Sequence, residues 1–484
     1  MESQPSPELL ILAPAGPDRT YDEYVRAFVD EGTLFPHASD YSLPNDLPDD
    51  LSTLKCIMID PARREEFERP PHAERLRRFA CEGGYVYYPD MKTPSGGILG
   101  YSILMHWVRR AIATAGLTAP HPEAIRRMQA RDEAELVEHW KRAAPDEMDQ
   151  YERMKHCFSD PTGFVTFRAA TEAAEYFRQP ALAEPVWAHI DRNLAAYGNG
   201  RYPCGGRFLL KLYERTGDRR YLDAVRAEIA GFRLWRMDGV WLNRDLQAPE
   251  GCDPDQPPPR VVANAWTWPE NASGVADTWA YLSKVTGEPQ WAEQALTHVL
   301  KSHRWMFEPK RSLYMHIGRP DGPDLRSAPW GRGNAWFLYA VRALLDDLPA
   351  GHSRRADLVE MLRLELEGLL RTQDALGLWH NVLDAGPGES NPCASATSRF
   401  IHIYAHAWSQ GWLRDERIPP MIERAWLGLK TKIWQYGLIA YCVGTAFNLS
   451  RQSYLARPHH TFRCSRSSLL LAWIEMQRMR ETAP

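Results

Sequence analysis

Short apolar runs alternate with amphipathic segments in the first 95 residues. Residues 9–14 (L-L-I-L-A-P) and 56–60 (C-I-M-I-D) are apolar, whereas residues 21–31 and 72–82 carry apolar positions at helical spacing. Runs of this length are typical of buried strands, and their alternation with helices favours a layered α/β arrangement. The pattern therefore predicts a small α/β domain over residues 1–95.

From about residue 97 onward, strand signals fade and helical periodicity takes over. Apolar residues recur three and four positions apart, and proline, glycine and aspartate fill the connecting segments. This pattern predicts a mainly α domain over residues 96–484. The expected helices span about 101–115, 121–143, 163–177, 182–197, 205–216, 219–233, 271–285, 289–308, 333–347, 353–373, 394–412, 418–434 and 463–480.

Two stretches of the helical region repeat the same pattern. Residues 208–230 begin F-L-L-K-L-Y-E-R-T-G-D, and residues 279–300 begin W-A-Y-L-S-K-V-T-G-E. In each, an apolar helix ends at the glycine, which we expect to cap it, and an amphipathic helix follows at once. Repeated helical hairpins indicate a closed or solenoidal array. Roughly a dozen helices make six hairpins, which favours an (α/α)6 barrel, a six-hairpin toroid, over an open superhelix.

Composition excludes several classes of partner. The net charge is −4 and no basic run is present, so we expect no nucleic-acid binding. The N-terminus (M-E-S-Q-P-S-P-E-L-L-I-L) lacks a basic segment before its short apolar run, so we expect no signal peptide, no membrane span and a cytoplasmic location. Eighteen tryptophans are many for this length; such a surplus suits stacking on sugars, although most must be core.

Cysteine and histidine spacing indicates no metal site. The eight cysteines are scattered without a C-x-x-C pair, which is typical of reduced thiols rather than disulfides or zinc ligands. The pairs His459-His460 and His402/His406 lack a third ligand in the sequence. We therefore expect neither a metal nor another cofactor.

One short segment, A-P-W-G-R-G-N-A-W at residues 328–336, combines a loop, a helix start and candidate ligand-binding side chains. Glycines on both sides of Arg332 let the backbone approach a ligand closely. A guanidinium near a helix start suits a carboxylate, and the indoles of Trp330 and Trp336 offer flat faces to a sugar ring. The alternative is a helix start whose aromatic residues belong to the core.

The N-terminal region resembles the small Rossmann-like domains of glutamine-amidotransferase-like proteins. It contains no G-x-G-x-x-G and no nucleophile elbow around its cysteines. We expect this region to have a structural or substrate-rim role rather than a second active site.

The helical region resembles a family of sugar-acid hydrolases. The T-G-D/E hairpins and W-G-R-G-N-A-W are followed by G-L-W-H-N-V-L-D (377–384), A-S-A-T-S-R-F (394–400), A-W-L-G-L (425–429), C-V-G-T (442–445) and Y-L-A-R-P (454–458). Their order over about residues 200–480 is similar to that of the unsaturated rhamnogalacturonyl hydrolases of glycoside hydrolase family 105, with the unsaturated glucuronyl hydrolases of family 88 as relatives. The first 95 residues lie outside this pattern.

The resemblance implies a fold and a reaction. The family is an (α/α)6 barrel that removes a 4,5-unsaturated uronic acid from the end of a lyase-generated oligosaccharide. A carboxylic acid protonates C4, an oxocarbenium-like centre develops at C5, water adds there, and the hemiketal opens to release the remaining sugar. This hydration differs from the two-carboxylate schemes of ordinary glycosidases, but it still needs a suitably placed proton donor.

The family's proton donor is an aspartate in a W-x-D segment that begins the helix ending in T-G. The matching segment here is Trp268-Pro269-Glu270, so the resemblance places Glu270 at the acid position, longer by one methylene, beside Trp268. Proline suits the first turn of a helix because its missing N–H has no partner there. The alternative is that Glu270 is only a charge at a helix N-terminus.

A second family carboxylate has no counterpart in this chain. The corresponding segment, residues 200–206 (G-R-Y-P-C-G-G), contains no acid. This departure puts the family's chemistry in doubt and suggests a different substrate or proton-transfer arrangement. Asp253 and Asp255 in the loop G-C-D-P-D-Q-P-P-P could supply a replacement, although acids in such loops are more commonly solvated.

Further substrate contacts follow from the resemblance. His316 in Y-M-H matches a family histidine that binds the sugar or positions water, unless it is a loop histidine with a structural role. Trp330 and Arg332 fall on the stacking and carboxylate-binding positions, and Trp336 adds a wall. The pocket rim is expected to include Ser395, Thr397, Arg399, Thr445, Tyr454 and Arg457. A family H-G near the last helix is replaced by H-H-T-F-R-C-S-R from His459 onward, which suggests altered contacts.

Taken together, these features predict a glycoside hydrolase acting on an oligosaccharide with a terminal uronic acid. Two alternatives remain open: a glycosidase or polysaccharide lyase on the same barrel, and a non-catalytic sugar-binding protein. A homo-oligomer is also left open.

Overall fold

The computed structural model describes most of the helical region and parts of the N-terminal region. The described residues are 9–12, 41–42, 47–51, 54, 56–59, 63–82, 85–87, 126, 129–144, 161–196, 205–243, 247–386, 389–390, 392–434, 437–438, 441–442, 450–455, 459–460 and 465–482. The chain separates into two compact units. The first comprises Met1–Asp132 with Lys430–Trp434 and Pro458–His460, and the second comprises the remainder.

The first unit contains a parallel sheet with helices. Its strands are β1 (Leu9–Leu12), β2 (Tyr41–Ser42), β3 (Cys56–Ile59) and β4 (Tyr85–Tyr87), in the order β2-β1-β3-β4. All three strand pairings are parallel, and β1 pairs with β3 along its whole length. The described helices are α2 (Arg64–Phe67) and α3 (His72–Cys81). These elements have the α/β content that the alternating pattern predicts.

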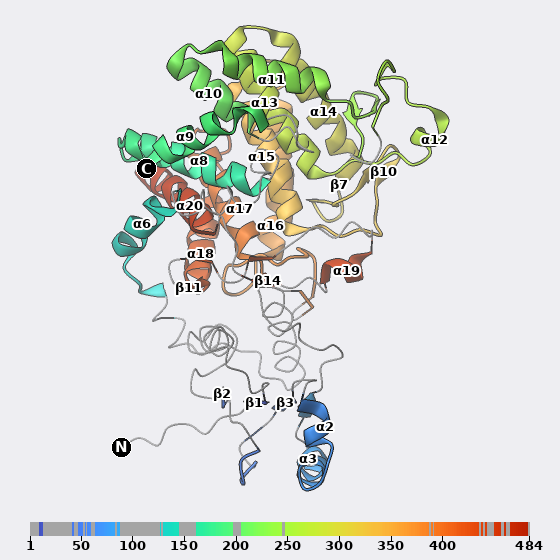
Figure 1. The fold of residues 1–484 in the computed structure, drawn as a ribbon, viewed down its shortest axis with the longest axis vertical. Helices are drawn as coiled ribbons and strands as arrows, with labels where there is room; N and C mark the ends of the chain where they lie inside the picture. The colour runs from blue at the N-terminus through green and yellow to red at the C-terminus, as the bar shows by residue number, and fades with distance from the viewer. Residues whose placement is uncertain are drawn as a thin grey trace. The chain divides into compact units, whose positions relative to one another are not determined.

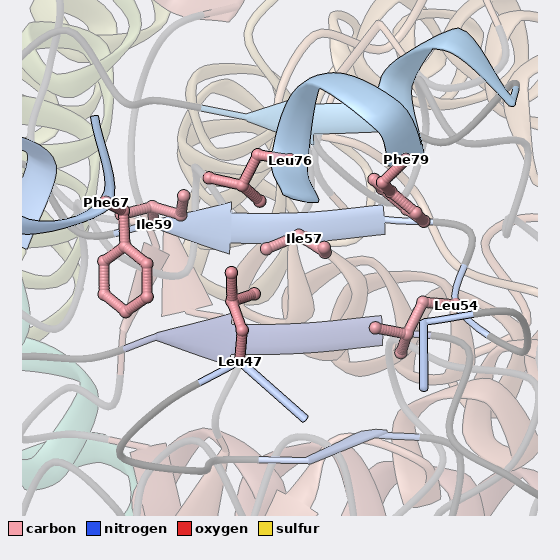
Figure 2. Close-up of a cluster of buried hydrophobic side chains, with 7 residues drawn as sticks. All are labelled: Leu47, Leu54, Ile57, Ile59, Phe67, Leu76 and Phe79. Atoms are coloured by element: carbon pink, nitrogen blue, oxygen red, sulfur yellow. The ribbon is translucent and has the colours of Figure 1, made fainter. Parts of the chain in front are cut away.

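The core of this sheet gathers around β3 (Figure 2). Ile57 and Ile59 are fully buried, and Leu76 and Phe79 of the amphipathic helix α3 pack with them. The expected boundary at residue 95 and the expected helix at 101–115 lie outside the described residues, so both stay predictions.

In the second unit, six described helices form a closed inner ring. They are α8 (Pro161–Tyr176), α10 (Gly206–Thr216), α13 (Pro269–Thr286), α15 (Gly331–Asp347), α17 (Ala394–Ser409) and α20 (Ser465–Glu481). Successive members from α10 to α20 pack side by side, and α20 packs against α8 (Figure 1). The ring closes between α8 and α10, where the rings of Phe167 and Phe208 lie 5.4 Å apart. The helices α13, α15 and α17 are buried on nearly all sides, as expected for an inner layer.

Amphipathic helices cover the outside of this ring. They include α9 (Glu184–Arg192), α11 (Arg219–Gly231), α14 (Pro289–Met306), α16 (Arg355–Thr372) and α18 (Ile418–Lys430), and α6 (Glu133–Lys141) packs against α20. On α14, the buried positions Ala292, Ala295, Leu296 and Val299 recur at three- and four-residue spacing, which defines one apolar face. The helices α11, α14 and α16 each pack against the preceding inner helix, so the architecture is built from helical hairpins.

Two of these hairpins confirm the turn predicted from T-G-D/E. Gly217 and Gly287 adopt left-handed conformations with φ of 73° and 71°, and their N–H groups donate to the carbonyls of Tyr213 and Ser283. Asp218 then caps α11 by accepting a hydrogen bond from the backbone N–H of Arg220 at 3.0 Å. A side chain would make the left-handed conformation costly, so glycine ends the first helix and allows an immediate reversal.

Short elements complete the described structure. They are η3 (Pro180–Ala183), η4 (Leu194–Ala196), α12 (Pro259–Val262), α19 (Arg451–Leu455), the hairpins β5 (Arg236–Met237)/β6 (Val240–Trp241), β7 (Phe307–Glu308)/β8 (Leu313–Tyr314) and β9 (Gly318–Arg319)/β10 (Gly322–Pro323), and the strands β11 (Ile433–Trp434), β12 (Gly437–Leu438), β13 (Tyr441–Cys442) and β14 (His459–His460). The helix expected at 182–197 is divided into η3, α9 and η4. Among the described helices, none combines the length and apolar character needed to cross a bilayer.

Candidate active site

Glu270 lies at the start of an inner-ring helix. The chain is extended at Trp268 (φ −145°, ψ 164°) and turns into α13 with Pro269 in the first turn, as the sequence predicts. Trp268 is buried, and its ring centroid lies 4.8 Å from that of Trp266. Only 6% of Glu270 is exposed, and its Oε2 atom is buried. A carboxyl group so placed is not an ordinary solvated charge at a helix N-terminus.

His316, which follows β8, lies beside this carboxyl group. Its Nε2 atom lies 3.4 Å from Oε2 of Glu270. Its Nδ1 atom lies 2.6 Å from the hydroxyl of Tyr454 on α19. Both His316 and Tyr454 are almost completely buried. Three elements that are separated in sequence thus bring a carboxyl, an imidazole and a phenol into contact, with the imidazole between the other two groups.

Trp330 packs directly on the imidazole of His316. Its ring centroid lies 4.7 Å from that of His316, and its indole N–H donates to Oδ1 of Asn381 at 2.9 Å. The amide nitrogen of Asn381 in turn donates to the backbone carbonyl of Tyr454 at 2.7 Å. Asn381 therefore ties the tryptophan and the tyrosine together, and both of their positions are fixed relative to His316.

The glycines beside Arg332 are explained by close packing. A Cβ atom on Gly333 would lie 2.9 Å from the Trp330 ring and 3.3 Å from the His316 ring, and one on Gly331 would lie 2.7 Å from the carbonyl oxygen of His380. The close approach that these glycines permit is thus to protein groups, which for Gly333 belong to the site itself. Gly333 also places Pro269 within reach, at 3.6 Å from the same Cβ position, so the first turns of α13 and α15 are adjacent.

Arg332 occupies the first turn of α15. Its guanidinium carbon lies 4.6 Å from the Trp330 ring centroid, a cation–π arrangement, and the residue is 8% exposed. The adjacent helix starts direct backbone N–H groups and positive dipole ends toward this region, which favours an anion. A guanidinium, an indole and two helix starts form a corner suited to a sugar carboxylate.

Trp336 lies one turn further along α15. It is buried, and the Arg399 guanidinium of α17 stands 4.4 Å from its ring centroid. Phe164 of α8 also packs near it, at 6.1 Å between ring centroids. Trp336 is therefore part of the inner-ring packing, and its expected role as a pocket wall stays a prediction.

Several other predicted residues can be placed only in part. Thr445 and Arg457 lie outside the described residues, as does most of the segment that lacks the second carboxylate. Asp253 and Asp255 are exposed; Asp253 accepts hydrogen bonds within its own loop, and Asp255 pairs with Arg236. The structure therefore gives no reason to assign either of them as the replacement carboxylate.

The sequence indicates Tyr454 only as a rim residue and does not distinguish Asn381. The single signal for Asn381 is its place inside G-L-W-H-N-V-L-D, where it and His380 are polar residues between apolar ones. Its partners Trp330 and Tyr454 lie 51 and 73 residues away, so only the fold reveals its function as a bridge.

A second group of ionisable residues lies inside the ring. Ligand-type atoms of Glu172, His402 and Glu475 lie within 4.8 Å of one another, a geometry that could hold a metal ion. The guanidinium of Arg342 contacts all three residues, 2.7 Å from Nε2 of His402 and 3.3 Å from each carboxylate. Burial alone would raise the pKa of Glu172, but Arg342 and His402 hold it well below its usual range. These residues fit an ion network better than a metal centre.

A ring of helical hairpins with a buried carboxyl–imidazole pair beside a tryptophan–arginine corner defines the class of an α/α-toroid protein suited to sugar acids. The chain belongs to Glycosyl Hydrolase Family 88, whose model matches residues 139–480. The match begins within the second unit, so the Rossmann-like assignment of the N-terminal region gains no support from it.

Curated relatives show the same affiliation at modest identity. An unsaturated 3S-rhamnoglycuronyl hydrolase of an Alteromonas species is 25% identical over 177 residues, which cover 36% of this chain and 43% of that protein. The unsaturated rhamnogalacturonyl hydrolase YesR of Bacillus subtilis is 26% identical over 236 residues, which cover 46% of this chain and 64% of that protein. The chain thus spans about half the length of these relatives.

Solved structures show the fold. A protein from Klebsiella pneumoniae described as a possible family 105 member superposes with a TM-score of 0.58 at 18% identity, covering 76% of this chain and 97% of the other. A structure described as a polysaccharide lyase superposes with a TM-score of 0.54 at 18% identity, covering 72% and 99%. The fold agrees with the (α/α)6 barrel expected from the hairpins, but at this identity it does not identify the reaction.

Proposed function

We propose that this chain is a glycoside hydrolase that removes a 4,5-unsaturated uronic acid from the end of a lyase-generated oligosaccharide by hydrating the C4=C5 bond. The observation that carries the proposal is the pairing of the buried Glu270 carboxyl with His316, 3.4 Å apart, beside Trp330 and Arg332. The family and the printed activities of its curated relatives support it.

In the proposed reaction, Glu270 is the acid. Its carboxyl group gives a proton to C4, and positive charge develops at C5 and the ring oxygen. Water adds at C5 and returns a proton to the Glu270 carboxylate, so the enzyme group is regenerated. The resulting hemiketal opens and releases the remaining saccharide. One carboxyl group, acting first as proton donor and then as proton acceptor, is sufficient for these steps. The reaction therefore does not require the second family carboxylate that this chain lacks.

The remaining site residues bind and orient the sugar. Arg332 provides a fork of N–H donors for the uronate carboxylate, and the helix starts of α13 and α15 add positive potential. Trp330 and Trp268 exclude water and shape the wall beside the carboxyl group, and His316 orients the acid. Trp336, Thr445 and Arg457 complete the proposed set of substrate-binding residues.

We extend the proposal to the domain organisation and the location of the chain. We propose six hairpins in the complete barrel, a boundary near residue 95, and a Rossmann-like N-terminal domain with a structural or rim role. We also propose a cytoplasmic location.

The test uses the ultraviolet absorbance of the unsaturated bond. Purified protein is mixed with lyase-digested pectin or glycosaminoglycan, and loss of the band is followed for the wild type, Glu270→Gln and Glu270→Asp. We expect Glu270→Gln to lose at least about 100-fold in rate and Glu270→Asp, which restores the family residue, to retain more. Glu365→Gln, a buried glutamate on the outer helix α16, is the matched control.

The possible results separate the candidate functions. Decay unchanged in Glu270→Gln would exclude Glu270 as the acid. Absence of decay on every unsaturated uronide, with a saturated oligosaccharide still bound, would favour a binding protein. Turnover of a saturated glycoside without prior lyase treatment would favour an ordinary glycosidase, and appearance of the band on intact polysaccharide would favour a lyase.

A further inference from the structure

The hydroxyl of Tyr454 is placed to control the imidazole beside the candidate acid. It lies 2.6 Å from Nδ1 of His316, and the two rings meet edge to face with centroids 5.5 Å apart at 87°. The opposite ring nitrogen, Nε2, lies 3.4 Å from Oε2 of Glu270. In a neutral imidazole, one nitrogen carries the proton and the other accepts, so a partner at Nδ1 decides what Nε2 presents to the carboxyl group.

The position of Tyr454 is fixed by contacts outside its own short helix. α19 has only five residues and could not hold a side chain rigidly by itself. Arg451 donates to Oδ1 of Asp384 at 2.6 Å, and the other oxygen of Asp384 pairs with Arg311 at 2.8 Å. Asn381 donates to the Tyr454 carbonyl at 2.7 Å. The segment that carries Tyr454 is therefore bound to the loop containing Asn381 and Asp384, and Asn381 of this loop also accepts the hydrogen bond from Trp330.

We propose that Tyr454 is a positioning residue that donates its hydroxyl proton to Nδ1 of His316 and thereby places the ring proton on Nε2, facing Glu270. An Nε2–H group 3.4 Å from Oε2 stabilises by its partial positive charge the carboxylate that remains after Glu270 has given its proton to C4. The imidazole keeps its own proton throughout, and water later reprotonates the carboxylate. The expected effect of Tyr454 on the hydrolysis rate rests on the proposed function, whereas the expected tautomer of His316 does not.

The tautomer can be read without substrate. The full chain is labelled with ¹⁵N-histidine, and the His316 signals are assigned by their loss in His316→Gln. We expect a protonated Nε2 and an unprotonated Nδ1 in the wild type, and a mixture of tautomers in Tyr454→Phe. A wild-type His316 protonated at Nδ1, or a tautomer unchanged in Tyr454→Phe, would overturn the proposal. The wild-type spectrum decides the tautomer even if the variant does not fold.

Kinetics supply the second readout. On an unsaturated disaccharide we expect Tyr454→Phe to lower kcat about tenfold while KM changes less than about twofold, because the hydroxyl acts on the acid rather than on substrate binding. Tyr339→Phe is the matched control, since it removes a hydroxyl–Nδ1 bond of 2.8 Å to His402 from another buried pair. An unchanged kcat in Tyr454→Phe would overturn the proposal. A wild type without turnover would instead contradict the proposed function, and the tautomer measurement would still decide this inference.

Discussion

At the scale of single residues, the site is a set of polar groups whose directions are fixed by apolar neighbours. Glu270 and His316 face each other in a buried setting, and Trp330 covers the imidazole. Arg332 then lies over the same tryptophan. Because one indole contacts both the imidazole and the guanidinium, the proposed acid and the proposed carboxylate-binding arginine share one wall of the candidate site.

Arg332→Lys tests the recognition half of this arrangement. Lysine keeps the charge but loses the planar fork that matches a carboxylate, so we expect KM for an unsaturated uronide to rise about tenfold with kcat nearly unchanged. Steady-state kinetics measure both constants. Arg414→Lys is the control, because Arg414 also stands over a tryptophan, 4.9 Å from the Trp408 ring centroid, outside the candidate site. Equal effects of the two substitutions would contradict a carboxylate role for Arg332.

The sequence located part of this site and not the rest, for a physical reason. Trp330 could be found from its local segment, and Trp268 and Glu270 from the family resemblance, because each stands in a short segment at the start of a helix. The bonds from Tyr454 to His316 and from Asn381 to Trp330 join residues 138 and 51 positions apart. Such contacts depend on how the hairpins close into a ring, which no local pattern encodes.

At the scale of elements, helices were more predictable than their ends and connections. The expected helix at 289–308 is α14 at Pro289–Met306, and the one at 353–373 is α16 at Arg355–Thr372. The expected helix at 182–197 is instead divided, and its first break falls where Pro185 opens α9, because proline favours the first turn of a helix over its interior.

Gly333→Ala tests whether α15 must approach the site this closely. The added Cβ would lie 2.9 Å from Trp330, so either the ring or the helix has to move. We expect the free energy of unfolding to fall by about 1–3 kcal/mol, and kcat/KM to fall with it because Trp330 covers His316. Denaturant titration and kinetics measure the two effects.

Gly231→Ala in α11 is the control for helix propensity. A Cβ there has nothing within 4 Å, so we expect stability to stay equal or to rise by up to about 1 kcal/mol. If Gly333→Ala behaved in the same way, the close packing of α15 on the site would not matter.

At the scale of the whole second unit, buried charges link the inner helices. Arg168 of α8 and Arg207 of α10 both donate to Asp277 of α13, at 2.7 and 2.8 Å. Arg342 of α15 contacts Glu475 of α20, which also pairs with His406 of α17 at 3.0 Å. Every inner helix contributes, so the interior depends on protonation as well as on apolar packing.

Acid should therefore destabilise the barrel before its carboxylates titrate. Burial lowers the pKa of His402 to about 4, with a further contribution from Arg342, and burial lowers that of His298 to about 3. The unfolded chain takes up protons near pH 6.5 while the folded chain does not, so this stability is present above pH 6.5 and is lost as pH falls toward 4. We expect each such histidine to contribute up to about 1.4 kcal/mol per pH unit in this window.

Urea titrations between pH 7 and 4.5 measure this slope, and His402→Gln should flatten it. His406 contributes little to this slope. Burial lowers its pKa, but its acidic neighbours raise the pKa by more, so His406 becomes protonated in both the folded and the unfolded chain as pH falls below 6.5. A slope as steep in His402→Gln as in the wild type would show that His402 is not kept neutral in the folded chain.

The contribution of Glu365 on α16 to stability depends on pH in the opposite direction. Its residue is fully buried, neither carboxyl oxygen has a hydrogen-bond partner among the described residues, and burial raises its pKa well above the usual value. The folded chain holds a proton there that the unfolded chain releases, so its contribution is fully present below about pH 4.5 and is lost as pH rises. Glutamine imitates the protonated form. We therefore expect Glu365→Gln to unfold with a free energy higher by about 1–3 kcal/mol at pH 8, and with little difference at pH 4.5.

Urea titrations of both proteins at the two pH values measure this difference, and the hydrolase assay at pH 7 checks that Glu365→Gln leaves the site intact. A gain that is equal at both pH values would mean that the substitution improves packing rather than removing a proton-linked cost. A loss at pH 8 would mean that the Glu365 carboxylate is charged in the folded chain and compensated there. Either result would leave His298 and the Arg342 network as the proton-linked groups, and the titrations between pH 7 and 4.5 test these.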